Sequence, residues 1–459
     1  MDKSEDKKRK KNSNRNFVAD KSEENVRRKK GSTTKMIVAE KSSEDGKKPK
    51  QRAQDPQLLN FVSKYLMQHS WYHGLMPREE IEELLQVEGN YLVRRTTEKG
   101  VPLFCLSVRH EDQVRHFPLQ YENAMWNLRN LLTKRHPDLV DLLNELVNEK
   151  FELPPSMAVL GKAIPRPDYY FLHDNITLDR KLGSGAFGEV WKGKLKLMGY
   201  ADVDVAVKRM KGNVTKKVIA EFMHEAKLMR QLTHKNIVSV FGVAPQEEPL
   251  MIVLELAANG TIKSYCKVNP NCPISQLVSF ATDSVRGMSY LSSKKVIHRD
   301  LAARNLLLGS MNEVKISDFG LSVAGKTEVT IEKMKLPIKW LAPETLESGR
   351  FTTKTDVWSF GVTLWEIFSR CTQDPFPGLT NALARELIKT QTPPMQPPPE
   401  TPPLISQMMN ECFRKSPEER PFFPVMLKRL SPEEDVTEYD VGQSPPVPCT
   451  YPNAVYQVH

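Results

Sequence analysis

The fold is decided by one stretch of sequence, IHRDLAARN at residues 297–305, where acidic, basic and amide side chains follow an apolar residue. Four further motifs stand around it in this order: GSGAFGEV at 183–190, VAVK at 205–208, SDFG at 317–320 and LAPE at 341–344. Glycines let backbone N–H groups close over phosphates, but a glycine-rich turn alone also occurs in dinucleotide binders. The complete ordered set is far more specific than that turn, and it predicts a phosphate-handling enzyme.

This set resembles the protein kinase family over a unit of about 255 residues. Ala302 stands where serine/threonine kinases usually have lysine, and PIKW at 337–340 is similar to the tyrosine kinases. The resemblance implies a bilobal domain that uses ATP and Mg²⁺. We expect this domain to cover residues 174–430, with an N-lobe at 174–256 and a C-lobe at 257–430.

The kinase resemblance also implies the catalytic residues. Asp300 is expected to orient the substrate hydroxyl and accept its proton, and Arg304 to balance charge near the transferred group. Lys208 is expected to hold the ATP phosphates while Glu225 orients it through an ion pair.

The same resemblance implies the cofactor ligands and several structural residues. Asn305 and Asp318 are oxygen donors suited to Mg²⁺. ATP is expected to contact Leu182, Gly183, Gly185, Gly188, Val190, Lys208, Glu255 and Ala257. The implied structural residues are the gatekeeper Leu254, the packed spine of His298, Phe319, Met229 and Val240, the ion pair of Glu344 with Arg420, and Asp356 beneath the catalytic loop.

A smaller module begins at WYHG, residues 71–74, and contains the strand-like run YLVR at 91–94. An arginine at the end of a buried run costs energy unless it is paired. A bidentate bond to a phosphate dianion is one pairing available to Arg94, and an internal ion pair is the alternative. These residues are similar to an SH2 domain, the phosphotyrosine reader, over about 85 residues. The resemblance implies a phosphotyrosine site made of Arg78, Arg94, Thr96 and His116.

The order of the two modules resembles the Fes/Fer cytoplasmic tyrosine kinases. It implies an α+β protein: a lead-in helix at 56–70, an SH2 domain at 71–158 with a central antiparallel sheet flanked by two helices, a linker at 159–173 and a bilobal kinase fold. The implied function is a non-receptor protein-tyrosine kinase that acts on protein tyrosines and is recruited to tyrosine-phosphorylated proteins. The alternative is a phosphotyrosine-binding adaptor with a silent kinase unit, which the complete catalytic set disfavours.

The loop between the SDFG and LAPE motifs contains no tyrosine. Counting back from Trp340, Glu328 stands where the family places its activating phosphotyrosine. A glutamate carries less charge than phosphotyrosine, and we expect Glu328 to pair in part with Arg299. Activation would then not need loop tyrosine phosphorylation. The alternatives are a solvated loop glutamate or activation through Thr327 or Thr330.

The chain of 459 residues has a net charge of +10, and residues 1–55 hold 18 lysine and arginine residues against 10 aspartate and glutamate. This polar segment is predicted to be a disordered solubilising arm, an import-receptor signal or a tether to anionic membrane. It offers no folded basic face for specific nucleic-acid binding.

The remaining sequence features concern location and the C-terminus. Without an apolar run long enough to span a bilayer or a signal peptide, the expected location is cytoplasmic, with membrane association or partial nuclear location left open through the arm. Residues 431–459 are predicted to form a flexible tail whose candidate autophosphorylation sites are Tyr439, Tyr451 and Tyr456.

Overall fold

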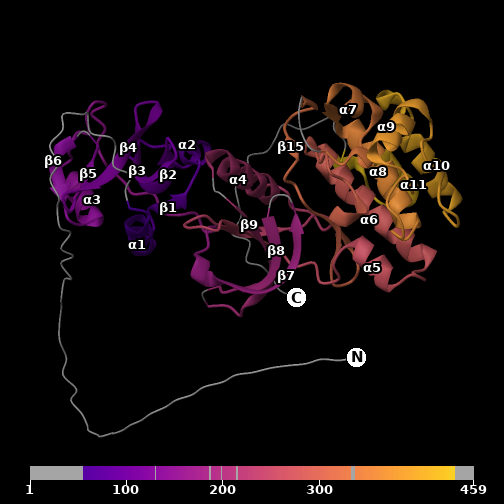
Figure 1. Cartoon of the computed structure of the whole chain (residues 1–459), viewed down its shortest axis with the longest axis horizontal. Helices are drawn as coiled ribbons and strands as arrows, with labels where there is room; N and C mark the ends of the chain where they lie inside the picture. Colours follow the sequence, from indigo (N-terminus) through magenta and orange to yellow (C-terminus); the bar gives the residue numbers. More distant parts are fainter. Residues whose placement is uncertain are drawn as a thin grey trace, which may run out of the picture. The chain divides into compact units, whose positions relative to one another are not determined.

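The computed structural model describes residues 55–439, apart from residues 130, 186–187, 198, 213–214 and 332–335 and the side chains of 132 and 438 (Figure 1). The predicted basic arm and two of the tail tyrosines, Tyr451 and Tyr456, lie outside the described residues. Within the described part of the chain, no helix is both long and apolar enough to cross a membrane.

The first domain is built on a six-stranded sheet of order β1-β2-β3-β4-β5-β6. β1 runs parallel to β2, and all other neighbours are antiparallel. The strands are β1 (Tyr72–Leu75), β2 (Tyr91–Glu98), β3 (Val101–His110), β4 (Gln113–Glu122), β5 (Met125–Leu128) and β6 (Leu131–His136). The two predicted helices are present as α2 (Arg78–Leu84) and α3 (Leu139–Asn148).

Helix α1 (Pro56–Leu66) precedes this sheet. Asp55 caps it by accepting the N–H of Gln57 at 2.9 Å, and proline occupies its first turn. Leu59, Val62 and Leu66 recur every three or four residues, so they form one apolar stripe, and all three are buried in the core of the first domain. The helix therefore belongs to the domain that it precedes.

The second domain opens with a five-stranded sheet of order β10-β11-β9-β8-β7. Its strands are β7 (Ile176–Gly185), β8 (Gly188–Leu195), β9 (Val203–Met210), β10 (Val240–Ala244) and β11 (Met251–Glu255). Helix α4 (Lys216–Arg230) is capped by Thr215 and buries one apolar face. Glu225 is buried on this same face, together with Phe222, Met223 and Met229. The helical periodicity therefore places its carboxylate on the side that faces the core.

The rest of the second domain is largely helical. Its helices are α5 (Ile262–Val268), α6 (Ile274–Ser293), α7 (Pro343–Ser348), α8 (Thr353–Phe368), α9 (Asn381–Thr390), α10 (Pro403–Cys412) and α11 (Phe423–Leu430). The short ladders pair β12 (Val296–Ile297) with β15 (Val323–Ala324), β13 (Leu306–Leu308) with β14 (Val314–Ile316), and β16 (Glu328–Thr330) with β17 (Arg350–Thr352). Helix α8 is buried from residue 355 to its end because it is apolar on nearly every side.

Residues 431–439 pack against the helical lobe. Glu434 forms a two-point ion pair with Arg286 of α6, with N–O distances of 2.6 and 2.9 Å. Tyr439 is only 4% exposed, and its hydroxyl lies 3.4 Å from His234. The expectation that the flexible tail begins at residue 431 is wrong, because these contacts anchor residues 431–439.

Candidate functional site

The glycine-rich turn joins β7 and β8, whose ladder extends to the pair of Gly185 with Gly188. A Cβ on Gly188 would lie 2.3 Å from the carbonyl oxygen of Arg209, so only glycine fits at this position. A Cβ on Gly183 or Gly185 would meet no described atom within 4 Å. These two glycines border open space, which fits a loop that closes over phosphates.

The other predicted ATP ligands lie on strands of the same sheet or just after its strand β11. Leu182 is 45% exposed at the edge of the turn, and Val190 pairs with Lys208 in the β8–β9 ladder. Glu255 ends β11, and its side chain is held 2.7 Å from the ammonium of Lys315. Ala257 follows in the segment between β11 and α5.

Lys208, Glu225 and Asp318 meet although they come from three separate elements. The Lys208 ammonium lies 2.6 Å from the carboxylate of Glu225 and 3.3 Å from that of Asp318. Burial opposes the charge on this lysine, but the two carboxylates outweigh burial and raise the pKa of Lys208. The side chain therefore remains a buried cation held by the two carboxylates.

Asp300 is the centre of a hydrogen-bonded group in the catalytic loop. Arg304 donates to one of its carboxylate oxygens, and the amide of Asn305 donates to the other at 2.8 Å. Burial raises the pKa of Asp300 above its ordinary value. The carboxylate is thus oriented by two neighbours and is poised to accept a proton more readily than an exposed aspartate.

Asn305 and Asp318 have the donor chemistry of a magnesium site. Because Asn305 donates its amide N–H₂ to Asp300, its amide oxygen is the atom left as an acceptor. Asp318 keeps a side chain that is 42% exposed. The described ranges contain no cluster of three or more His, Cys, Asp or Glu residues able to hold a metal ion. Mg²⁺ needs no such cluster, because it takes one or two side chains together with substrate phosphates.

The backbone on either side of this group is strained. Arg299 and Asp318 have φ values of +69° and +63°, which cost about 1–2 kcal/mol each in a non-glycine residue. Asp356 offsets this cost at the loop by accepting the N–H groups of His298 at 2.8 Å and Arg299 at 2.9 Å. Burial raises the pKa of Asp356 to about 6.

The predicted packing residues also lie together. The rings of His298 and Phe319 meet edge to face with centroids 5.1 Å apart. Met229 belongs to the same buried cluster, and Val240 and Leu254 pack against it. At the far side of the lobe, Arg420 is 1% exposed and binds both carboxylate oxygens of Glu344 at 2.6 and 2.8 Å.

Glu366 is a residue of this site that the sequence reasoning missed. One of its carboxylate oxygens accepts the N–H of Ala303 at 3.0 Å and the indole N–H of Trp340 at 2.9 Å. It therefore ties the catalytic loop to the segment that precedes α7. The available signal was a carboxylate inside the apolar helix α8, which has to be paired if it is buried.

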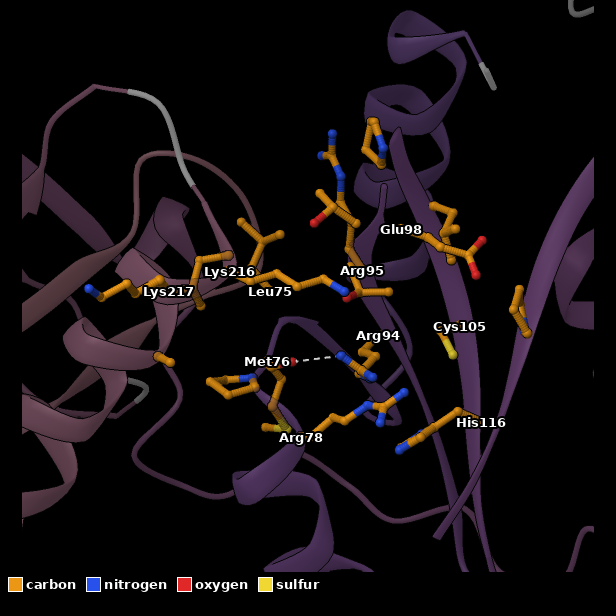
Figure 2. A pocket seen from close by; sticks show the side chains of 18 of the residues that line it. Leu75, Met76, Arg78, Arg94, Arg95, Glu98, Cys105, His116, Lys216 and Lys217 are labelled. Carbon is orange, nitrogen blue, oxygen red and sulfur yellow. Dashed lines mark hydrogen bonds between the residues drawn. The ribbon is translucent and has the colours of Figure 1, made fainter. Parts of the chain in front are cut away.

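All four predicted phosphotyrosine ligands line one cavity of about 600 Å³. Figure 2 shows three of them, Arg78, Arg94 and His116. Arg94 is 4% exposed and donates to the carbonyl of Met76 at 3.0 Å, while its Nε has no partner among the described residues. No carboxylate in the described part of the chain forms an ion pair with it, so the alternative of an internal pair is not realised. Burial and the charges of Arg94 and Arg78 lower the pKa of His116 to about 4. The cavity thus holds a buried cation with unused donor capacity, beside a neutral imidazole.

The structure corrects the predicted partner of Glu328. Its carboxylate lies 2.8 Å from the guanidinium of Arg350 on the neighbouring strand β17, instead of pairing with Arg299. The reason is the β16–β17 ladder, which sets Glu328 opposite Thr352 and brings residue 350 within reach. Arg299 instead lies over the ring of Phe351, 4.7 Å from its centroid.

Comparison with known families and proteins agrees with this geometry. Residues 176–430 match the protein tyrosine and serine/threonine kinase family, and residues 71–149 match the SH2 domain. The chain is 40% identical over 369 residues to Fer-related kinase 1 of Caenorhabditis elegans, covering 78% of this chain and 92% of that protein. It is 38% identical over 380 residues to the human tyrosine-protein kinase Fer, covering 82% of this chain and 45% of that protein.

A viral relative adds to this comparison. The transforming protein Fps of avian sarcoma virus (strain PRCII) is 36% identical over 377 residues, which cover 81% of this chain and 69% of that protein. The chain spans about half the length of human Fer. The resemblance found in the sequence is confirmed, and the chain belongs to the Fer/Fes family of tyrosine kinases, in which an SH2 domain precedes the kinase domain.

Proposed function

We propose that the chain is a non-receptor protein-tyrosine kinase that transfers the γ-phosphate of ATP to tyrosine hydroxyls of proteins. The observation that carries this proposal is the meeting of Lys208, Glu225 and Asp318 within hydrogen-bond distance. Phosphoryl transfer depends on positioning and on charge stabilisation, so the three groups must be in place together. Their arrangement supports a kinase unit that is ready to bind ATP.

The roles of the residues follow from their contacts. Asp300, oriented by Arg304 and Asn305, orients the tyrosine hydroxyl and accepts its proton. Arg304 also lies over the ring of Trp340, 4.6 Å from its centroid, which fixes its charge beside the transferred phosphoryl group. Lys208 binds the ATP phosphates. The exposed Leu182 and the strand residue Val190 cover the adenine, which the backbone of Glu255 and Ala257 binds.

Protein kinases as a family use ATP with a divalent metal ion. For this chain we infer Mg²⁺, with Asn305 and Asp318 as its ligands, because both offer oxygen atoms. The ion, when bound, neutralises charge on the phosphates during transfer. The buried Arg94 and its neighbours Arg78, Thr96 and His116 bind phosphotyrosine and recruit the kinase to phosphorylated proteins.

A regulatory proposal concerns the loop that lacks tyrosine. We infer that the ion pair of Glu328 with Arg350 holds the β16–β17 ladder without phosphorylation. Both side chains are nearly half exposed, so the pair itself contributes at most about 1 kcal/mol. A cytoplasmic location and any contact of the basic arm with membrane or an import receptor remain predictions.

The function is tested by comparing the wild-type chain with Asp300→Asn in ATP, Mg²⁺ and a tyrosine-containing peptide. We expect the variant to lose at least about 100-fold in kcat, because a positioned general base contributes 10²–10⁴-fold. Equal and negligible phosphotyrosine output from both proteins would overturn the proposal in favour of a phosphotyrosine-binding adaptor.

A further inference from the structure

The phosphotyrosine cavity is bounded by both domains. Besides the SH2 residues, its lining includes Lys216, Lys217, Ile219 and Ala220 of the kinase helix α4, together with Glu248. Figure 2 shows Lys216 and Lys217 beside the SH2 residues. A pocket that reads phosphotyrosine with the SH2 domain alone would not need the start of α4 at its wall. The position of this helix therefore bears on what the pocket binds.

Backbone contacts and apolar packing between the two domains fix α4 at this wall. Leu75 of β1 donates its N–H to the carbonyl of Pro245 at 2.7 Å. A Cβ on Gly74, which has a φ of +70°, would lie 2.2 Å from the Cα of Gln246, so the two backbones touch. Ile219 and Phe222 of α4 share one buried apolar cluster with residues of both domains. The start of α4 is therefore set by packing, which places Lys216 at the wall of the cavity.

Lys216 is the first residue of α4, a position at which a positive charge is unfavourable. The amino end of a helix carries partial positive charge, and the first turn of α4 contains no acidic residue to balance it. Among the described residues no carboxylate lies within ion-pair distance of Lys216. Figure 2 shows its side chain extending from α4 toward Arg95 on β2, whereas the neighbouring Lys217 points away. Lys217 instead pairs with Glu221 at 3.8 Å.

The charges around the cavity leave capacity for an anion. Apart from Lys217, which points away, four cationic side chains line it against three carboxylates, those of Glu79, Glu98 and Glu248. Glu98 is already bound by Arg129. At the base of the cavity Arg94 is nearly fully buried, and its Nε has no partner in the described part of the chain. A phosphate dianion would satisfy Arg94 and relieve the unbalanced charge at the start of α4 together.

We propose that Lys216 is a ligand of the phosphate group held by Arg94, so that the phosphotyrosine site is completed by the kinase domain. This inference rests on the proposed function of the SH2 pocket. It assigns to Lys216 a charge-assisted contact with the bound phosphate. Because Lys216 is exposed to solvent, we expect its removal to weaken binding by about three- to tenfold, less than a buried charged hydrogen bond would.

The test is a fluorescence-anisotropy titration of the full chain with a labelled peptide that has one phosphotyrosine between glycines and serines. The phosphate is then the only anionic side group of the probe. Lys216→Ala should weaken binding about three- to tenfold, Lys216→Arg should stay within about twofold of wild type, and the matched control Lys217→Ala should also stay within about twofold. The affinity of the wild type should fall more steeply with salt than that of Lys216→Ala, because one ionic contact is lost.

A fourth variant separates this inference from the function on which it rests. Arg94→Ala should abolish binding. If it does and Lys216→Ala binds like wild type, the phosphotyrosine site stands and the role of Lys216 is wrong. If Arg94→Ala binds like wild type, the pocket does not read phosphotyrosine and both proposals fail. Equal losses in Lys216→Ala and Lys217→Ala would also overturn the inference, because they would indicate a general charge effect.

Discussion

Two buried carboxylates of α8 hold the backbone of the catalytic loop. Asp356 binds two consecutive N–H groups just before Asp300, and Glu366 binds the N–H of Ala303 just after it. A buried donor that loses its acceptor costs about 1–3 kcal/mol. Helix α8 therefore positions the proposed base from both sides, although neither carboxylate is proposed to touch the substrate.

At this residue scale we predict different effects for two substitutions of Glu366. Glu366→Ala leaves the N–H of Ala303 and the indole of Trp340 without an acceptor, so the free energy of unfolding should fall by about 2–5 kcal/mol and kcat should drop. Glu366→Gln keeps an oxygen at the same position and should lose less than half as much. Urea unfolding and steady-state kinetics measure both effects. Equal losses in the two variants would contradict the hydrogen-bonding role.

The contrast between these carboxylates shows what the sequence could predict at single residues. Asp300, Lys208 and Asp318 stand in motifs whose local order is specific, so their grouping could be predicted. Glu366 stands outside those motifs, and its partners lie 63 and 26 residues away along the chain. The partner of Glu328 was mispredicted for a similar reason, because a strand pairing decides it.

Among the elements, α4 is the one shared by the proposed catalytic and recognition sites. It carries Glu225 to Lys208, and it packs Phe222 and Met223 into a cluster that includes SH2 residues. An ion pair of Lys227 with Glu83 of α2 adds to this contact, but both side chains are partly exposed. Apolar burial is worth more than an exposed ion pair, so the cluster should dominate the attachment of α4.

We therefore predict that truncating the cluster costs far more than removing the ion pair. Met223→Ala should lower the free energy of unfolding by about 2–5 kcal/mol through the cavity that it leaves, and should lower kcat because Glu225 is nearby on the same helix. Lys227→Ala should cost less than about 1 kcal/mol. Thermal unfolding and kinase assays of both variants check this. A larger loss in Lys227→Ala would contradict it.

We predict that the β16–β17 ladder depends on the ion pair between Glu328 and Arg350. Glu328→Ala removes the ion pair with Arg350, and kcat/KM should fall by about two- to fivefold, as expected for an exposed pair. The protein should carry no phosphate on Thr327 or Thr330, which mass spectrometry can establish. Thr327→Ala and Thr330→Ala serve as controls and should keep wild-type activity. Unchanged activity in Glu328→Ala would disprove the role of this pair.

At the scale of the whole molecule, the sequence did not predict the packing of the SH2 domain against the kinase domain. Motifs indicated each domain and its ligands, because those signals are local. The cluster that joins residues 75–92 to residues 210–252 depends on pairings across more than one hundred positions. The same is true of Lys216, which looks like an ordinary surface lysine until α4 is placed against β2. The anchoring of residues 431–439 likewise depends on Arg286 and His234.

A buried histidine at the start of the SH2 domain makes the stability of the chain depend on pH. Burial lowers the pKa of His73 to about 4, and the ring lies 2.9 Å from the carbonyl of Ile164. Between pH 4 and the ordinary value of 6.5 the unfolded chain binds more protons at this site, so stability falls as the pH falls. The site should account for roughly 3 kcal/mol across this window.

We accordingly predict that His73→Gln flattens the pH dependence of the melting temperature between pH 6.5 and pH 4.5. The comparison with wild type cancels the contributions of the other titrating groups. His224→Gln, a substitution at an exposed position of α4, is the matched control and should leave the slope unchanged. Parallel curves for wild type and His73→Gln would show that His73 is not the group responsible.

The central claim is that this chain transfers phosphate to tyrosine, and phosphoamino-acid analysis tests it most directly. The purified chain is incubated with γ-labelled ATP, Mg²⁺ and a protein substrate that offers tyrosine, serine and threonine, and the labelled product is hydrolysed. We expect the label on phosphotyrosine alone in the wild type and none in Asp300→Asn. Label on phosphoserine or phosphothreonine, or a wild type that transfers no more label than Asp300→Asn, would contradict the claim.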